Sequence, residues 1–132
     1  MRAMDRQRRG FVLMAGAAIA GAAFAPVRAS PAGAQTMYGL IGKMTAHAGK
    51  RDELVAILLE GVHDMPGCLS YIVAHDAGDA DAIWITEVWD SQDSHAASLK
   101  LPAVRAAIAR AMPIIAGFDA GTTTRPVGGH GL

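Results

Sequence analysis

Three residues in the second half of the chain have types and spacing that suit proton transfer beside an apolar wall. Glu87 and Trp89 alternate on one face of an apolar segment, and His95 follows six residues later. An unperturbed imidazole titrates near neutral pH, so His95 suits a general base. We predict that these three catalytic candidates line one pocket. The structural alternative is a core tryptophan, a carboxylate paired with a helix N-terminus or an arginine, and a solvent-facing histidine.

Five further residues are candidates for the binding surface of that pocket. Tyr71 belongs to an apolar segment whose alternation can place it opposite Glu87 or Trp89, where its hydroxyl could bond a substrate oxygen. Four others would supply apolar walls, although ordinary core packing is the better explanation of each: Tyr38, Leu99, Ile108 and Met112.

The remaining histidines and the single cysteine do not predict a metal site. None of these histidines forms a pair with zinc-site spacing, and one cysteine cannot complete such a site; they are His47, His63, His75 and His130. A lone cysteine also excludes a disulfide within the chain. We expect Cys68 to be buried, because it opens an apolar strand.

Hydrophobic periodicity and turn residues divide the chain into alternating strands and helices. Period-two alternation predicts four strands, over residues 37–45, 68–75, 83–89 and 118–125. Gly39 and Gly42 in the first strand mark a close backbone approach or a bulge. Helical periodicity predicts a helix from Lys50 to about Asp64, a second over residues 91–99, and a third that starts at Pro102 and ends or kinks at Pro113.

The resulting order is βαββαβ with the second helix split, which predicts an α+β, ferredoxin-like fold. This plan is an antiparallel four-stranded sheet with helices on one face. The other face also needs a cover, and a second copy of the sheet in a C2 homodimer would provide it. Candidates for that face or for the core, between which alternation alone does not choose, are Ile41, Ile72, Ala74, Trp84 and Val88.

Residues 1–34 read as an export signal. A basic segment with paired Arg8 and Arg9 precedes an apolar run of about 15 residues, which is too short for a membrane anchor. The arginine pair followed by Gly-Phe-Val resembles a bacterial twin-arginine signal, although Gln7 departs from that motif. Cleavage after Ala29 or Ala34 would leave one domain over residues 35–126 and a flexible tail over 127–132. We therefore expect a periplasmic or secreted protein.

The charge of the exported part argues against a nucleic-acid partner. Residues 1–29 carry five arginines and one aspartate, whereas the remainder has seven Lys and Arg against eleven Asp and Glu. A net charge near −4 does not suit phosphate binding, which needs a clustered basic face. It also argues against an anionic membrane surface.

Several segments together resemble a known family. They are Met-Pro-Gly-Cys-Leu-Ser-Tyr at residues 65–71, Glu-Val-Trp-Asp-Ser at 87–91, His95, and Leu-Pro-Ala-Val at 101–104. Residues 37–124 are similar to the antibiotic biosynthesis monooxygenase domain of the dimeric α+β barrel superfamily, above all to its small quinol monooxygenase-like members. The resemblance implies a homodimer that oxygenates an electron-rich phenol or quinol with molecular oxygen as co-substrate and no cofactor.

One departure from the family pattern keeps other functions open. Characterised oxygenases of this family often place an asparagine near the active tryptophan or on the first strand, and this chain contains no asparagine. The alternative is a non-catalytic barrel that binds a small ligand or serves as an accessory subunit. Haem binding or degradation is a weaker possibility. The haem-degrading branch of the family resembles an Asn-Trp-His arrangement, and this chain has no asparagine to supply its first member.

Overall fold

The structure, a computed structural model, describes residues 36–132, so the predicted export signal lies outside the described residues. No helix within the described part is long and apolar enough to cross a membrane. The elements are β1 (Tyr38–Ala46), α1 (Arg51–Gly61), β2 (Cys68–His75), β3 (Ala82–Trp89), α2 (Gln92–Ser98), α3 (Pro102–Ala111), β4 (Ile115–Phe118) and β5 (Thr122–Thr124).

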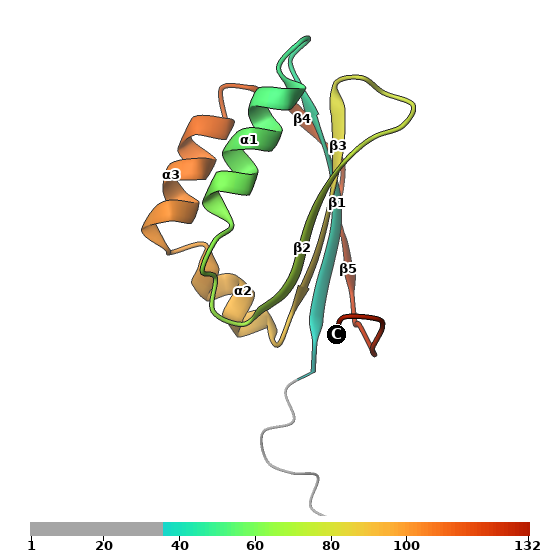
Figure 1. The fold of residues 1–132 in the computed structure, drawn as a ribbon, viewed down its shortest axis with the longest axis vertical. Helices are drawn as coiled ribbons and strands as arrows, with labels where there is room; N and C mark the ends of the chain where they lie inside the picture. Colours follow the sequence, from blue (N-terminus) through green and yellow to red (C-terminus); the bar gives the residue numbers. More distant parts are fainter. Residues whose placement is uncertain (1–35) are drawn as a thin grey trace, which may run out of the picture. The chain divides into compact units, whose positions relative to one another are not determined.

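The strands form one antiparallel sheet in the order β2-β3-β1-β4, with β5 also paired to β1. The three helices lie on one face of this sheet (Figure 1). The predicted ferredoxin-like α+β arrangement is therefore confirmed. Short connections explain the antiparallel pairing of β2 with β3, because a polar loop of six residues joins them.

The predicted last strand is wrong in its start and its continuity. In place of one strand over residues 118–125, β4 pairs with the end of β1 and β5 with its beginning. The pairing shifts by one residue between the two pieces, since Phe118 lies opposite Met44 and Thr122 lies opposite Ile41. Asp119 and Gly121 stand in the interruption, and both residue types are poor strand formers.

Helix α1 buries the stripe that its periodicity predicts, whereas α3 buries Ala107 and Ala111 and leaves Ile108 exposed. In α1 the buried residues are Leu54, Ile57, Leu58 and Gly61, and the helix ends at Gly61 rather than near Asp64. At Gly61 a side chain would collide with the Cβ of Ala107, so this glycine allows α1 and α3 to approach closely. Pro102 occupies the first turn of α3, where its missing N–H costs no hydrogen bond.

The core lies between the sheet and the α1–α3 pair. Ile83 and Ile85 of β3 project into it, together with Ala46 of β1 and Ala111 of α3. In β2 an irregularity between Cys68 and Ser70 breaks the predicted alternation, which had Leu69 and Tyr71 on one face. Leu69 is exposed whereas Tyr71 packs against the core, and Cys68 is only partly buried instead of fully buried.

No helix of residues 36–132 covers the opposite face of the sheet (Figure 1), and side chains form rows across three strands there. One row consists of Ile41, Thr86 and Ile72, and the next begins with Lys43 and Trp84. Ile72 is 53% exposed and Trp84 is 41% exposed, which is unusual for large apolar side chains in the middle of strands. The structure thereby decides which face these residues occupy.

A polar clamp fixes the β2–β3 loop to this face. One oxygen of the Asp76 carboxylate accepts hydrogen bonds from the backbone N–H groups of Gly78 (2.8 Å) and Asp79 (2.9 Å). The other oxygen accepts one from Trp84 Nε1 at 2.7 Å and lies 3.2 Å from Lys43 Nζ. These donors, with the Trp84 bond foremost, lower the pKa of Asp76 from 3.8 to about 2.

The clamp predicts a pH-dependent stability. A carboxylate whose pKa falls on folding stabilises the protein above its unfolded pKa, and this contribution disappears as the pH drops through the folded pKa. We expect Asp76→Asn to be less stable than wild type at pH 7, with the difference vanishing between about pH 4 and pH 2. Urea unfolding at several pH values measures this.

Glu53→Gln is the matched control for that experiment. Glu53 forms an exposed ion pair with Lys50 at 2.9 Å, and such pairs contribute little to stability. The free energy of unfolding of this variant should differ little from that of wild type at pH 2 or at pH 7. A destabilisation of Asp76→Asn that is equally large at pH 2 and pH 7 would contradict the proposed role of the charge.

Candidate active site

The end of β3 and the first turns of α2 place the three catalytic candidates together. Glu87 and Trp89 both project toward the helices, because they alternate with residues of the opposite face. Ser91 then caps α2, its hydroxyl accepting a hydrogen bond from the Ser94 backbone N–H at 3.1 Å. A serine in this position fixes where the helix starts, which sets the direction in which His95 projects.

Trp89, Glu87 and His95 form a connected polar group. Trp89 is 1% exposed, and its indole Nε1 donates a hydrogen bond to Glu87 Oε2 at 2.8 Å. His95 Nε2 lies 3.8 Å from the same oxygen, and the His95 ring meets the Trp89 ring edge-on at a centroid distance of 5.4 Å. The side chains of Glu87 and His95 are 15% and 19% exposed. A carboxylate so placed stabilises an imidazolium when the histidine accepts a proton.

These groups line a mostly apolar cavity of about 170 Å³ between the sheet and the helices. Its volume resembles that of an engineered cavity of ~150 Å³ that binds benzene, so it has the size of one aromatic ring. Six residues of the predicted site line this cavity: Tyr71, Glu87, Trp89, His95, Leu99 and Ile108.

Tyr71 enters the cavity from β2, where it lies directly opposite Glu87 in the strand pairing. Burial, and secondarily the negative charge of Glu87, raise the pKa of the Tyr71 hydroxyl far above its usual value. The phenol therefore stays protonated at neutral pH. It can donate a hydrogen bond to an oxygen in the cavity, but it is not suited to act as a base.

Two predicted wall residues lie outside this cavity. Met112 lines an adjoining hollow of about 240 Å³ with Ile108, Phe118 and other apolar residues. The ring of Tyr38 packs against His95 at a centroid distance of 5.3 Å and lines a larger hollow on the other side. Tyr38 thus forms part of the wall of the larger hollow and not of the inner cavity.

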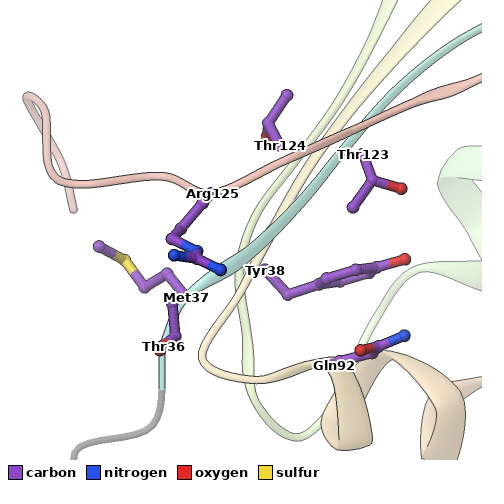
Figure 2. A pocket seen from close by; sticks show the side chains of 7 residues that line it. All are labelled: Thr36, Met37, Tyr38, Gln92, Thr123, Thr124 and Arg125. Atoms are coloured by element: carbon purple, nitrogen blue, oxygen red, sulfur yellow. The ribbon is translucent and has the colours of Figure 1, made fainter.

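That larger hollow has a volume of about 620 Å³ and a different character. Figure 2 shows the side chains of Tyr38 and Gln92 pointing to the same side, with Arg125 just after the neighbouring strand β5. It is lined by Thr36, Met37, Tyr38, Gln92, Thr123, Thr124 and Arg125. The sequence offered one signal for it, since Gln92 stands one helical turn before His95.

Other lining residues of the inner cavity carried no functional signal in the sequence. They come from β1, α1, the loop after α1, and α3, where their periodicity is that of a core: Met44, Leu58, Gly61, Val62, Met65, Ser98, Val104 and Ala107. Nothing in a helical stripe distinguishes residues that fill a core from residues that surround a hollow.

Within residues 36–132, no group of three or more His, Cys, Asp or Glu side chains is placed to hold a metal ion. The polar groups at the cavity are instead suited to proton transfer and hydrogen bonding. A histidine, a carboxylate 3.8 Å from it and a protonated phenol surround a space of ring size.

Comparison with protein families identifies one match. Residues 37–110 match the model of the family described as antibiotic biosynthesis monooxygenase. This range covers more than half of the chain and includes Tyr71, Glu87, Trp89 and His95. Curated proteins yield no match.

Solved structures agree with the family match. One from Chloroflexus aurantiacus J-10-fl, named provisionally as an antibiotic biosynthesis monooxygenase, shares 64% identity over 72% of this chain and 97% of its own, with a TM-score of 0.71. Provisional members from Caulobacter crescentus CB15 (21% identity, 72% and 93% coverage, TM-score 0.66) and Nitrosomonas europaea (14%, 70% and 92%, 0.65) share the fold.

The placement of Tyr71 predicts a spectroscopic result. The chain has two tyrosines, so Tyr38→Phe leaves Tyr71 as the only phenol to titrate by ultraviolet absorbance. In this background Tyr71 should ionise well above pH 10, and adding Glu87→Gln should lower its midpoint because a nearby negative charge is removed. Circular dichroism would establish that the protein stays folded over the titration. A midpoint that is unchanged or higher without Glu87 would contradict the arrangement.

Proposed function

Because the chain belongs to the antibiotic biosynthesis monooxygenase family, we propose that it is a cofactor-independent monooxygenase of an electron-rich small aromatic, such as a quinol or polyphenol. The observation that supports this most is the Glu87–His95 pair at the wall of a ring-sized apolar cavity. A fold alone does not define an activity, so the proposal depends on these side chains.

In the first step His95 accepts a proton from a hydroxyl of the bound ring. The imidazolium that forms is stabilised by Glu87, whose Oε2 lies 3.8 Å from His95 Nε2. Trp89 holds that carboxylate in place through its 2.8 Å hydrogen bond. The apolar walls of the cavity exclude water from the substrate. The Tyr71 hydroxyl donates a hydrogen bond to the negatively charged substrate oxygen.

The second step needs molecular oxygen as the co-substrate. The phenolate gives one electron to dioxygen, and the resulting radical and superoxide combine to form a carbon–oxygen bond. Cleavage of the O–O bond leaves one oxygen atom on the ring. The other leaves as water with two protons, one lost from the ring carbon and one returned by His95. A quinol and dioxygen thus give a hydroxyquinone and water.

A second candidate is a non-catalytic barrel that binds a small aromatic ligand or acts as an accessory subunit. The observation that favours it is the absence of asparagine from the whole chain, because characterised family oxygenases often use one. The ring-sized cavity supports binding as well as it supports catalysis. The cavity volume gives no support to the haem alternative, since it is comparable to that of a single ring.

We further propose that the protein works outside the cytoplasm as a homodimer. The basic and apolar pattern of residues 1–34 supports export. The exposed row of Ile41 and Ile72 beside Trp84 supports a second copy as the cover of the open sheet face. A paired Lys43 and Asp76 on that face avoid like-charge repulsion between two copies.

Oxygen uptake with a panel of hydroquinones tests the activity. We expect consumption above the non-enzymatic rate, and a loss of roughly 10²- to 10⁴-fold in kcat/KM for His95→Ala because the general base is removed. Glu87→Gln should also lower the rate, since it removes the charge that stabilises the imidazolium. His47→Ala, in the turn after β1 and outside the cavity lining, is the control and should retain wild-type rates.

The same assay separates the two candidate functions. No oxygen consumption above background, together with unchanged quenching of tryptophan fluorescence by the quinol in wild type and His95→Ala, would reject the enzyme and favour the binding protein. Equal rates in wild type and His95→Ala would reject His95 as the base.

The homodimer is tested independently by light scattering of the exported form. We expect a mass of two chains for wild type and of one chain for Ile72→Glu, because a charge would be buried in the apolar row. Glu60→Lys, on the helix side, is a control that should remain dimeric. A monomeric wild type at micromolar concentration would contradict this assembly.

A further inference from the structure

The inner cavity is continued by a second space, the hollow of about 240 Å³ beside Met112, which we call the Met112 hollow. Three of the residues that line it also line the inner cavity, so the two spaces meet at side chains from β1, α1 and α3. All of its lining residues are apolar: Met44, Leu58 and Ile108, which are shared, and Ala111, Met112, Ile115 and Phe118.

One side of α3 runs along both spaces. Val104, Ile108 and Met112 are spaced by four residues, so their side chains follow one another on the same helix face. Val104 lines the inner cavity, Ile108 lines both spaces, and Met112 lines the Met112 hollow. Met112 follows the last residue of α3 and keeps helical backbone angles. This face therefore leads from the candidate active site to the Met112 hollow within about two helical turns.

The polar groups of the candidate site lie at one end of the combined space. Glu87, His95 and Tyr71 line the inner cavity and not the Met112 hollow. The helix α2, which carries His95, follows the end of β3 that pairs with the start of β1, whereas β4 pairs with the end of β1. Figure 1 accordingly shows α2 and β4 at opposite ends of the sheet. A matching ligand has hydroxyl groups at one end and an apolar group at the other.

The outer end of the Met112 hollow leaves large apolar side chains in contact with water. Met112 is 53% exposed and Phe118 is 56% exposed. Phe118 lies opposite Met44, which lies opposite the core residue Ile83, so Phe118 projects to the helix side of the sheet. The second copy proposed for the open face would therefore leave both residues uncovered. An apolar group in the hollow would remove them from water, which is favourable in proportion to the area buried.

We propose that the Met112 hollow is a specificity subsite that binds the alkyl substituent of a substrate whose hydroxylated ring occupies the inner cavity. This inference rests on the proposed function and narrows its substrate to a quinol or polyphenol with an apolar chain. The hollow is larger than a cavity of ~150 Å³ that holds the six carbons of benzene, so a chain of about six carbons fits. The flexible, unbranched side chains of Met44 and Met112 can adapt to such a chain.

Calorimetric titration without oxygen tests the subsite separately from turnover. The probes are methylhydroquinone and hexylhydroquinone, which share one ring and differ in the length of the alkyl chain. Complete burial of one methylene group raises an affinity about fourfold. Because the hollow is open to solvent at its outer end, we expect about half of this gain, so that wild type binds the hexyl compound at least about thirtyfold more tightly.

Met112→Glu is the variant that tests the assignment, because it places a carboxylate at the outer end of the hollow on an already exposed side chain. A bound alkyl chain would displace water from this charge, so the ratio of hexyl to methyl affinity should fall at least about tenfold. The ratio is the readout, since a change that affects both ligands alike cancels in it.

Leu59→Glu is the matched control. Leu59 is a similarly exposed apolar residue of α1 that lines neither the inner cavity nor the Met112 hollow, so this variant should keep the wild-type ratio. Equal affinities of wild type for the two compounds would overturn the proposal. So would no measurable binding of hexylhydroquinone, or the same ratio in Met112→Glu and wild type.

Light scattering of Met112→Glu provides a further check. We expect the same mass as wild type, because the hollow lies on the helix side of the sheet. A monomeric variant beside a dimeric wild type would assign this surface to the contact between two copies and would overturn the proposal.

The outcomes for subsite and enzyme remain distinguishable. A Met112-dependent gain from the alkyl chain, with no oxygen uptake on either compound, would uphold the subsite as part of a binding protein and reject the monooxygenase. Oxygen uptake with methylhydroquinone, without any gain in affinity from the longer chain, would uphold the enzyme and reject the subsite.

Discussion

The hydrogen bond from the buried indole of Trp89 to Glu87 is the interaction on which the candidate site depends. An indole N–H that is removed from water needs an acceptor, and Glu87 provides it from two residues away on the same strand face. This bond keeps a carboxylate inside a largely apolar space, where it would otherwise turn toward solvent. The same carboxylate then lies 3.8 Å from His95, and its charge adds to the burial that raises the pKa of Tyr71. One hydrogen bond therefore fixes where this charge stands relative to both side chains.

The cavity exists because the helices do not cover the sheet evenly. Gly61 and Ala107 let α1 and α3 approach closely, while α2 is a separate short helix at the end of β3. The inner cavity lies where these elements diverge, and His95 of α2 forms part of its wall. A further glycine, Gly67, has a positive φ of 82° and lies so close to Ser94 that a side chain there would collide with it. The loop after α1 can thus pack directly on the helix that carries His95.

The two faces of the sheet carry different features. The helix face carries the cavity, whereas the open face carries Ile41, Ile72 and Trp84 with the Asp76 clamp. The clamp keeps the exposed Trp84 in one orientation, which preserves a defined surface for the proposed second copy. Along the β1 edge, Gly39 instead allows the final segment to approach and brings Arg125 beside Tyr38. Small residues therefore decide where the chain approaches itself and where it leaves space.

Local patterns in the sequence determined the order of elements, the strand face shared by Glu87 and Trp89, and the start of α2 ahead of His95. Each of these follows from alternation, helical period or a cap within a few residues. The family resemblance came from the same segments. Only the tertiary structure decided that Tyr38 and Met112 lie outside the inner cavity, that the last strand is two pieces, and that Arg125 shares a separate hollow with Tyr38. Those outcomes depend on contacts between segments distant in the chain, and alternation says which residues share a face but not what lies across from it.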